Sequence, residues 1–290
     1  MSDRVILIQS ADHHAGHALG LCNPEVQLFS PDGEPFTPSL HETQRYLWYD
    51  RWIGPLEEIR HWAGRSTVHV QLAGDLGQGN KHKDEWISQS TFDSQATIIQ
   101  ANLEPLFRIF KRLEAVEIAI GTGAHNFGTG GLEIIARNLV QSAHPKVPID
   151  ISYHNRSCVH GCWVDMAHHG PWPGSRKWLH GNGPRFYLRD AMMRDYNVLG
   201  KEPSKIYLRG HYHTKVCERV EEFLGGKEYE SWIIEVPSLL GLGDYAHKAT
   251  RSISTITNGI CAIEIIDGEP RLPPRWFVRT IDVRTERSYG

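Results

Sequence analysis

Two histidines one residue apart, in the stretch "GHYHT" from Gly210 to Thr214, directly follow the apolar run "KIYLR". At this spacing two imidazole rings at a strand end or turn can point into one space. The pair is a weak signal by itself, because the chain has 17 histidines among 290 residues. Its significance depends on whether other strand ends supply matching side chains.

Four other segments also run an apolar stretch into a short polar turn: "SADHHAG", "AGDLGQGN", "GTGAHN" and "MAHHG". The side chains that the five turns offer are Asp12, His14, Asp75, His125, His168, His169, His211 and His213. Sites in α/β folds form at strand carboxyl ends, where the backbone is fixed and side chains face a crevice. Mixed carboxylate and imidazole ligands suit Mn, Fe, Zn or Co. Two such ions about 3.5–4 Å apart can clamp the attacking and leaving oxygens of a phosphoryl displacement.

The elements that must position these side chains alternate in the first half of the chain. Strands are expected at 4–10, 66–75 and 116–125, and helical patterns cover 41–63 (interrupted near Pro55), 90–115 and 131–143. In the second half, strand-like runs dominate, at 149–155, 162–170, 204–213, 230–239 and 259–270, with one helical pattern at 186–199. We therefore expect one α/β domain over residues 1–290, with mixed sheets covered by helices.

The composition is that of an ordinary globular protein, with 40% hydrophobic and 22% charged residues and a net charge of -3. The five cysteines are odd in number and scattered, which favours a reducing compartment, and Cys158 with Cys162 is expected to be a pair of free thiols rather than a zinc site. The N-terminus has no secretory pattern, and no apolar run reaches the roughly 18 residues of a membrane span. We expect a cytoplasmic protein without membrane partners.

The ordered set D-x-H, G-D, G-x-H, a single His and G-H-x-H, from Asp12 to His213, resembles the signature of the calcineurin-like metallophosphoesterases. The wider segments "ADHHAGHALGLCNP", "GTGAHNFGTGG" and "AHHGPWPGSRKWLHGN" look most like phosphoesterases carried by phages and prophages. The resemblance implies a four-layer α-β-β-α sandwich with two mixed β-sheets.

It also implies two divalent metal ions, with Mn²⁺ as the first expectation and Fe, Zn, Co or Ni as alternatives. The implied ligands are Asp12, His14 and His213 for one ion, Asp75 as the bridge, and His168 with His211 for the other. A hydroxide between the ions would attack phosphorus, and His125 would stabilise the transition state or protonate the leaving oxygen.

One position departs from the family pattern. Ala124 stands where the family has an asparagine that supplies an oxygen to the second metal, and alanine cannot coordinate. Thr122 or Asn126 could substitute, and His169 could orient a neighbouring ligand.

A basic and aromatic stretch offers a binding surface for phosphate. Arg176, Lys177 and Arg185 lie among tryptophan, phenylalanine and tyrosine residues, and could bind a phosphate backbone while the rings stack on bases. A solvated basic loop with its aromatic side chains packed inward explains the same pattern equally well.

The leading hypothesis is a metal-dependent phosphoesterase, in particular a phosphodiesterase or nuclease-like hydrolase that acts on nucleic acid or nucleotides. A phosphomonoesterase, including a protein phosphatase, is the alternative within enzymes, because the same metal centre serves both reactions. A catalytically weak scaffold that keeps the fold for binding is the third reading, motivated by Ala124.

Overall fold

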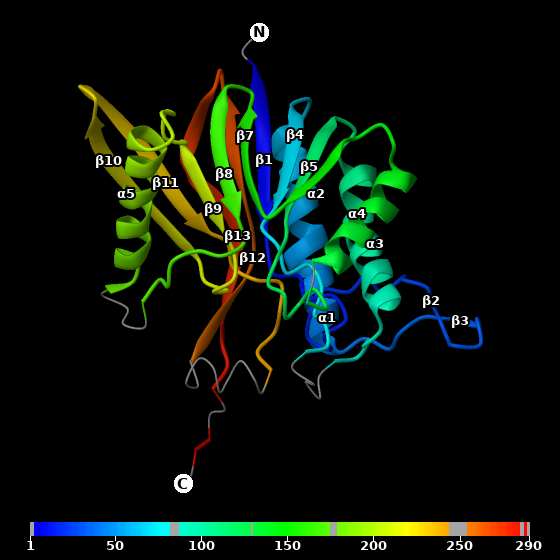
Figure 1. The fold of residues 1–290 in the computed structure, drawn as a ribbon. Coiled ribbons are helices and arrows are strands. Elements are labelled where there is room, and N and C mark those ends of the chain that lie inside the picture. Colours follow the sequence, from blue (N-terminus) through cyan, green and yellow to red (C-terminus); the bar gives the residue numbers. More distant parts are fainter. Residues whose placement is uncertain are drawn as a thin grey trace.

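Two mixed β-sheets dominate the computed structural model, which describes residues 3–81, 87–128, 130–174, 179–243, 254–284 and 287–288 (Figure 1). In spatial order the six-stranded sheet consists of β13 (Glu269–Asp282), β12 (Thr255–Ile266), β1 (Arg4–Ser10), β4 (Thr67–Leu72), β5 (Leu113–Ala119) and β6 (Ile149–Ser152). Strands β1, β4, β5 and β6 run parallel to one another, whereas β12 pairs antiparallel with β1 and with β13.

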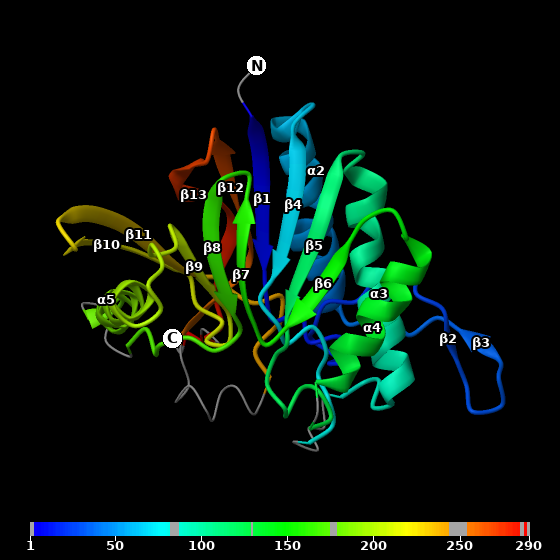
Figure 2. The same ribbon diagram turned by 45° about the horizontal axis from the view of Figure 1, so that its top comes forward.

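The second sheet has five strands. In spatial order they are β10 (Val216–Leu224), β11 (Lys227–Glu235), β9 (Ile206–Arg209), β8 (Cys162–Ala167) and β7 (His154–Val159). The β11–β9 and β9–β8 pairs are parallel, and the two outer pairs are antiparallel. Both sheets are therefore mixed, as expected from the sequence. A short hairpin of β2 (Leu28–Phe29) and β3 (Pro35–Phe36) stands apart from them (Figure 2).

Helices cover the outer face of each sheet (Figure 1). Those beside the six-stranded sheet are α1 (Glu42–Tyr46), the π-helix η1 (Leu47–Ile53), α2 (Gly54–Ala63), α3 (Phe92–Ile109) and α4 (Gly131–Ala143). Helix α5 (Asn182–Asn197) lies against the five-stranded sheet. Near Pro55 the helix changes type without a break in the helical backbone: the π-helix ends at Ile53 and α2 begins at Gly54, with Pro55 in its first turn. A proline is tolerated there because its missing N–H has no partner within the first turn of a helix.

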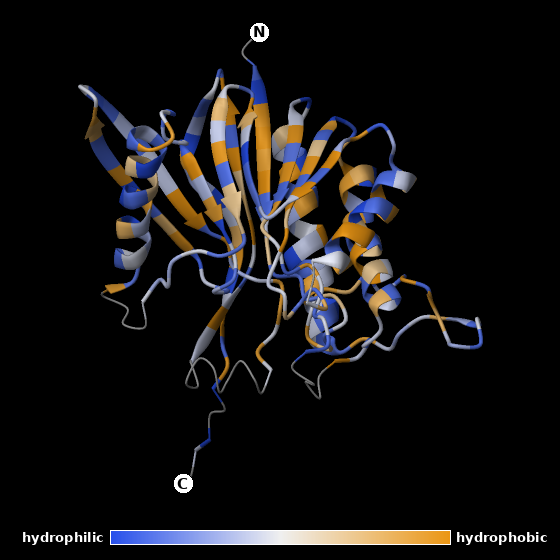
Figure 3. Cartoon of the chain, viewed as in Figure 1, coloured by the Kyte–Doolittle hydropathy of each residue, from blue (hydrophilic) through white to orange (hydrophobic). Residues whose placement is uncertain are grey.

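Alternation along the central strands distributes apolar side chains between separate cores. Ile6 and Ile8 of β1 pack with the helices, whereas Val5 and Leu7 pack toward the five-stranded sheet. A strand that is buried on both faces must be apolar throughout, since successive side chains point to opposite sides. Figure 3 shows this nearly continuous hydrophobic colour along β1 and the alternating colours of β10 and β11.

Two sequence expectations about element boundaries are wrong. The stretch 149–155 does not form one strand beside 162–170: residues 149–152 belong to the six-stranded sheet, and β7 turns away at His154 to pair with β8. The helix expected over 90–115 ends at Ile109, because Phe110 is extended and β5 already begins at Leu113. Short apolar runs do not distinguish a helix end from a strand start.

Other expectations concern cysteines, membranes and domain count. All five cysteines are free, as predicted for Cys158 and Cys162. Among the described residues no helix is long and apolar enough to cross a membrane. The cytoplasmic location and the single domain over 1–290 stay predictions.

Candidate metal centre

The predicted aspartates and histidines follow β1, β4, β5, β8 and β9, and strands β1, β4 and β8 point toward the same end of the molecule (Figure 2). Three groups of potential ligand atoms result, each with its atoms within 4.8 Å of one another. The groups are Asp12 with His14 and His213, His14 with Asp75 and His125, and Asp75 with His168 and His211. Shared members join the three groups into one centre.

The first group brings three potential ligand atoms close together. His213 Nε2 lies 3.2 Å from Asp12 Oδ1 and 3.2 Å from His14 Nε2. His14 Nε2 is also 3.8 Å from the same Asp12 oxygen. Three atoms with lone pairs thus face a common point, the arrangement that a divalent cation requires.

Asp75 connects the two ends of the centre. Its Oδ2 atom lies 3.0 Å from His168 Nε2 and 3.9 Å from His125 Nε2. Asp75 is buried between these imidazoles, at the position where a bridging carboxylate is expected.

The backbone is strained at the centre itself. Among the described residues, eight non-glycine residues have positive φ, and five of them are predicted ligands: Asp12, His14, Asp75, His211 and His213. Left-handed backbone at non-glycine residues costs free energy and concentrates at functional sites. The free-energy cost of this left-handed backbone therefore falls on five residues whose side chains lie around the same centre.

Hydrogen bonds to Nδ1 orient three of the imidazoles. His168 Nδ1 donates to Ala73 O at 2.6 Å, and His125 Nδ1 donates to the backbone oxygen of Gln78 at 2.8 Å. Since a carbonyl oxygen can only accept, Nδ1 must carry a proton, and in the neutral ring Nε2 is then the nitrogen whose lone pair faces the centre. His14 Nδ1 makes the corresponding contact with the Gln78 side-chain oxygen at 2.9 Å. A metal-binding histidine needs this kind of support.

Buried atoms without partners provide a test of whether a metal fits here. Within the described residues, neither Asp12 Oδ1 nor His168 Nε2 has a hydrogen-bond partner, although both are buried. The 3.0 Å contact of His168 Nε2 with Asp75 lacks hydrogen-bond geometry. Orphaned buried polar atoms are rare and costly, and here they point at the shared centre. The donor set therefore fits divalent cations.

The pKa values of three proposed ligands also indicate that the centre suits divalent cations. Burial opposes charging of His168, yet the neighbouring Asp75 carboxylate raises the His168 pKa to about 10. Burial would raise the pKa of Asp75, but His168 outweighs it and holds that pKa below its usual range. Burial lowers the pKa of His211 to about 4, so this ring is neutral and able to coordinate. Cations would replace the His168 proton as the partner of Asp75.

The residues around Ala124 divide into those near the centre and those turned away. Thr122 donates its backbone N–H and its hydroxyl to Asp75 Oδ1, at 2.6 and 3.1 Å. The His169 ring is exposed, with its centroid 4.7 Å from that of His211. Asn126 is buried and donates to Glu133, so its amide serves α4 instead of the centre. Thr122 and His169 are thus the candidates that lie beside the centre.

Sequence reasoning missed Glu133, a buried carboxylate on α4. It accepts hydrogen bonds from Leu76 N (2.9 Å), Gly121 N (2.8 Å) and Asn126 Nδ2 (2.9 Å). These donors belong to the loops after β4 and β5, which carry Asp75 and His125. Burial and the charge of Asp75 raise the Glu133 pKa to about 7. Helical periodicity gave no signal for it, since a single Glu in an amphipathic helix is normally read as solvent-facing.

Gln95 on α3 is a second missed residue. Its side-chain oxygen accepts from Gln78 N (3.1 Å) and Gly79 N (2.8 Å), and its amide donates to Gly79 O and Gln89 O. The buried side chain thereby fixes the loop whose Gln78 holds two imidazoles. The "GDLGQGN" turn signalled this loop, but nothing in the sequence connected it with α3.

The predicted phosphate-binding residues are only partly placed. Arg176 and Lys177 lie outside the described residues. Arg185 lies at the start of α5, where Nη2 donates to Asn182 and Nη1 is 3.4 Å from a carboxylate oxygen of Glu218. Its guanidinium is therefore already paired with an acid.

Comparison with known proteins adds little. No family model and no curated protein sequence matches this chain. A solved structure from Streptococcus pneumoniae TIGR4, described as a conserved uncharacterized protein and predicted phosphoesterase, is similar at 11% identity and a TM-score of 0.31. The alignment covers 96% of this chain and 98% of that one.

Proposed function

We propose that this chain is a metal-dependent phosphodiesterase of the calcineurin-like type, with two divalent cations and the α-β-β-α layering of that family. The observation that supports it most is the convergence of Asp12, Asp75 and His213 with four other predicted residues in one connected centre. Mixed carboxylate and imidazole donors in this number suit Mn²⁺ and similar borderline ions.

The proposed ligand roles are those that the resemblance in the sequence implies, and the first and third groups are consistent with them. Asp12, His14 and His213 would hold one cation, His168 and His211 the other, and Asp75 would contact both. Bound divalent cations supply Lewis-acid chemistry, since they polarise a phosphoryl group and make water more acidic. Thr122 keeps the shared carboxylate in place through its backbone N–H and its hydroxyl, which contacts both carboxylate oxygens.

His125 is the residue of this chain suited to proton transfer. Its Nδ1–H is held by Gln78 O, so Nε2 faces the centre at 3.9 Å from Asp75 Oδ2. To protonate a leaving oxygen, Nε2 must first take up a proton. The same atom also belongs to a potential ligand group with His14 and Asp75, so a ligand role is the alternative for this residue.

Hydrolysis of bis(p-nitrophenyl) phosphate tests the proposal. The purified chain should turn over this diester with Mn²⁺ and stop when a chelator is added. Asp75→Asn and His211→Ala should abolish turnover, whereas Asp190→Asn and His61→Ala, which change exposed residues on α5 and α2, should leave it intact. Full activity of the Asp75→Asn, His211→Ala double variant would overturn the proposal. A preference for p-nitrophenyl phosphate over the diester would instead favour a phosphomonoesterase.

A further inference from the structure

A row of aromatic rings leads away from the metal centre. The ring of Tyr212 lies 4.8 Å from that of His211, and the Trp172 ring lies 5.1 Å from that of Tyr212 in an edge-on arrangement. Trp172 is 54% exposed, so one of the largest apolar side chains of the protein stands in solvent beside a proposed metal ligand. An exposed indole that is fixed by a neighbouring ring is a ready stacking surface.

The row continues onto helix α5. The backbone oxygen of Trp172 approaches Gly183 so closely that a Cβ there would lie 2.4 Å from it. Phe186 follows three residues later on the same helix face and is 69% exposed. A second exposed ring therefore stands one helical turn from the point where the Trp172 backbone contacts α5.

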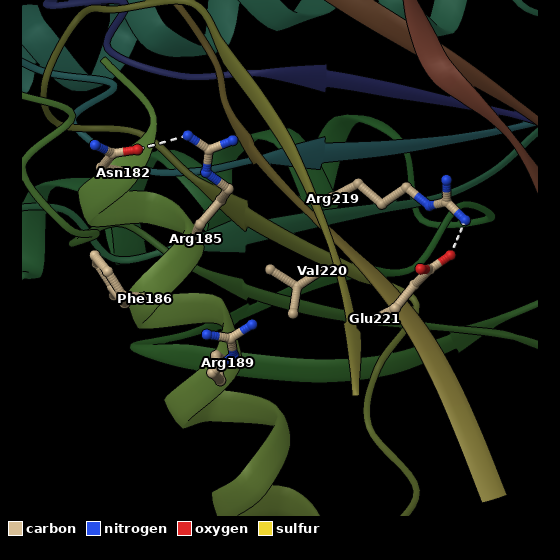
Figure 4. Close-up of a pocket in the computed structure, with 7 residues that line it drawn as sticks. All are labelled: Asn182, Arg185, Phe186, Arg189, Arg219, Val220 and Glu221. Atoms are coloured by element: carbon tan, nitrogen blue, oxygen red, sulfur yellow. Dashed lines mark hydrogen bonds and ion pairs between the residues drawn. The ribbon is translucent and has the colours of Figure 1, made fainter. Parts of the chain in front are cut away.

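Phe186 also lines a cleft of about 370 Å³ between α5 and β10 (Figure 4). The residues that line it are Asn182, Arg185, Phe186, Arg189, Arg219, Val220 and Glu221. Figure 4 shows Arg185 and Arg189 extending from α5, whereas the guanidinium of Arg219, on β10, is turned away from them toward Glu221.

The three arginines are neutralised by nearby carboxylates. Arg185 pairs with Glu218, Arg189 with Glu222, and Arg219 with Glu221 and Glu230. Each guanidinium has five N–H donors, and these side chains are about half exposed, so donors remain for a ligand. The cleft can therefore donate hydrogen bonds to phosphate oxygens without strong long-range attraction.

We propose that this surface, from Tyr212 and Trp172 to Phe186 and the arginine cleft, binds single-stranded nucleic acid and leads a strand to the metal centre. The inference rests on the proposed function, because it names the substrate class of that same centre. Exposed rings stack on bases in a sequence-tolerant manner, and only unpaired bases offer their faces. Arginine forks suit the phosphates between stacked bases.

Binding without turnover tests this inference. Fluorescence anisotropy with labelled oligo(dT) of 15 nucleotides in EDTA should show binding, and a duplex of the same length should bind more weakly. Trp172→Ala and Phe186→Ala should each weaken binding about 5- to 150-fold, the range expected for one base–aromatic stack. The salt dependence should be shallow, because the glutamates already neutralise the arginines.

Phe223→Ala is the matched control. This phenylalanine is 73% exposed on β10 of the same sheet but lies outside the row and the cleft, and its variant should bind like the wild type. Oligo(U) in a parallel titration distinguishes RNA from DNA as the strand. Equal binding by the wild type, Trp172→Ala and Phe186→Ala, or tighter binding of the duplex, would overturn the inference.

The two proposals fail separately. Turnover of bis(p-nitrophenyl) phosphate without binding of oligo(dT) or oligo(U) would remove the nucleic-acid surface and leave the phosphodiesterase standing. Binding that depends on Trp172 and Phe186, without turnover of any diester, would support the surface and remove the phosphodiesterase.

Discussion

Replacing Glu133 by alanine removes the acceptor that the loops after β4 and β5 share. Three buried donors, Leu76 N, Gly121 N and Asn126 Nδ2, would lose their partner. Each unsatisfied buried donor costs about 1–3 kcal/mol, so the gross loss is on the order of 6 kcal/mol. Against this, a pKa raised from 4.5 to about 7 costs the folded wild type about 3 kcal/mol at pH 8, and the variant escapes that cost.

The net loss in the free energy of unfolding for Glu133→Ala is therefore about 3 kcal/mol at pH 8. It should be larger at pH 5.5, because the wild type is destabilised progressively as the pH rises from 4.5 through 7, while the variant is not. Urea unfolding of both proteins at the two pH values, in EDTA, measures the difference. Glu104→Ala, which removes an exposed glutamate on α3, should stay within about 0.5 kcal/mol.

Catalysis should fall together with stability, since the loops that carry Asp75 and His125 lose their common anchor. The diesterase kcat/KM of Glu133→Ala, measured at a temperature where the variant is folded, should drop well below that of Glu104→Ala. A variant as stable and as active as the wild type would refute the reasoning. So would a loss of stability that is greater at pH 8 than at pH 5.5.

Three further variants test other parts of the account. Glu235→Gln should be more stable than the wild type by about 5 kcal/mol at pH 9 and gain little at pH 4 in urea unfolding. Burial raises the Glu235 pKa to about 8, and neither carboxylate oxygen has a hydrogen-bond partner among the described residues. Equal gains at both pH values would contradict this. Gly121→Ala should abolish diesterase activity, since its Cβ would lie 2.0 Å from Asp75 Oδ1, whereas Gly123→Ala, with its nearest contact at 3.7 Å, should keep it. Gln78→Ala should weaken Mn²⁺ binding about 10- to 100-fold in calorimetric titrations, because His14 Nδ1 loses its side-chain partner, whereas the backbone oxygen that holds His125 stays. Unchanged affinity would rule out that role for the Gln78 side chain.

The strand ends could be predicted from the sequence because apolar runs and polar turns are local patterns. "RVILIQS" matches β1 residue for residue, and the turn after it carries Asp12 and His14. Parallel strands bring such turns to one edge, so residues 199 positions apart, such as His14 and His213, meet at 3.2 Å. The order of the motifs therefore carried spatial information.

The supporting residues could not be predicted in the same way. Glu133 and Gln95 act through side-chain contacts between helices and loops, which no local period encodes. Asn126 follows His125 in the sequence and was a reasonable substitute ligand, yet its amide turns to Glu133. Arg185 was predicted as a phosphate-binding group from its basic and aromatic neighbours in the sequence, which gave no sign that Glu218 lies opposite it. Pairing across the fold decides these roles, and a single sequence does not contain that information.

Calorimetric titration of the chelator-treated chain with Mn²⁺, alongside Asp75→Asn, tests the metal centre most directly. The account predicts saturable binding of two ions per chain with release of protons, since Mn²⁺ displaces the proton of His168, and loss of at least one ion in the variant. Absence of saturable binding by the wild type, or identical binding by Asp75→Asn, would contradict it.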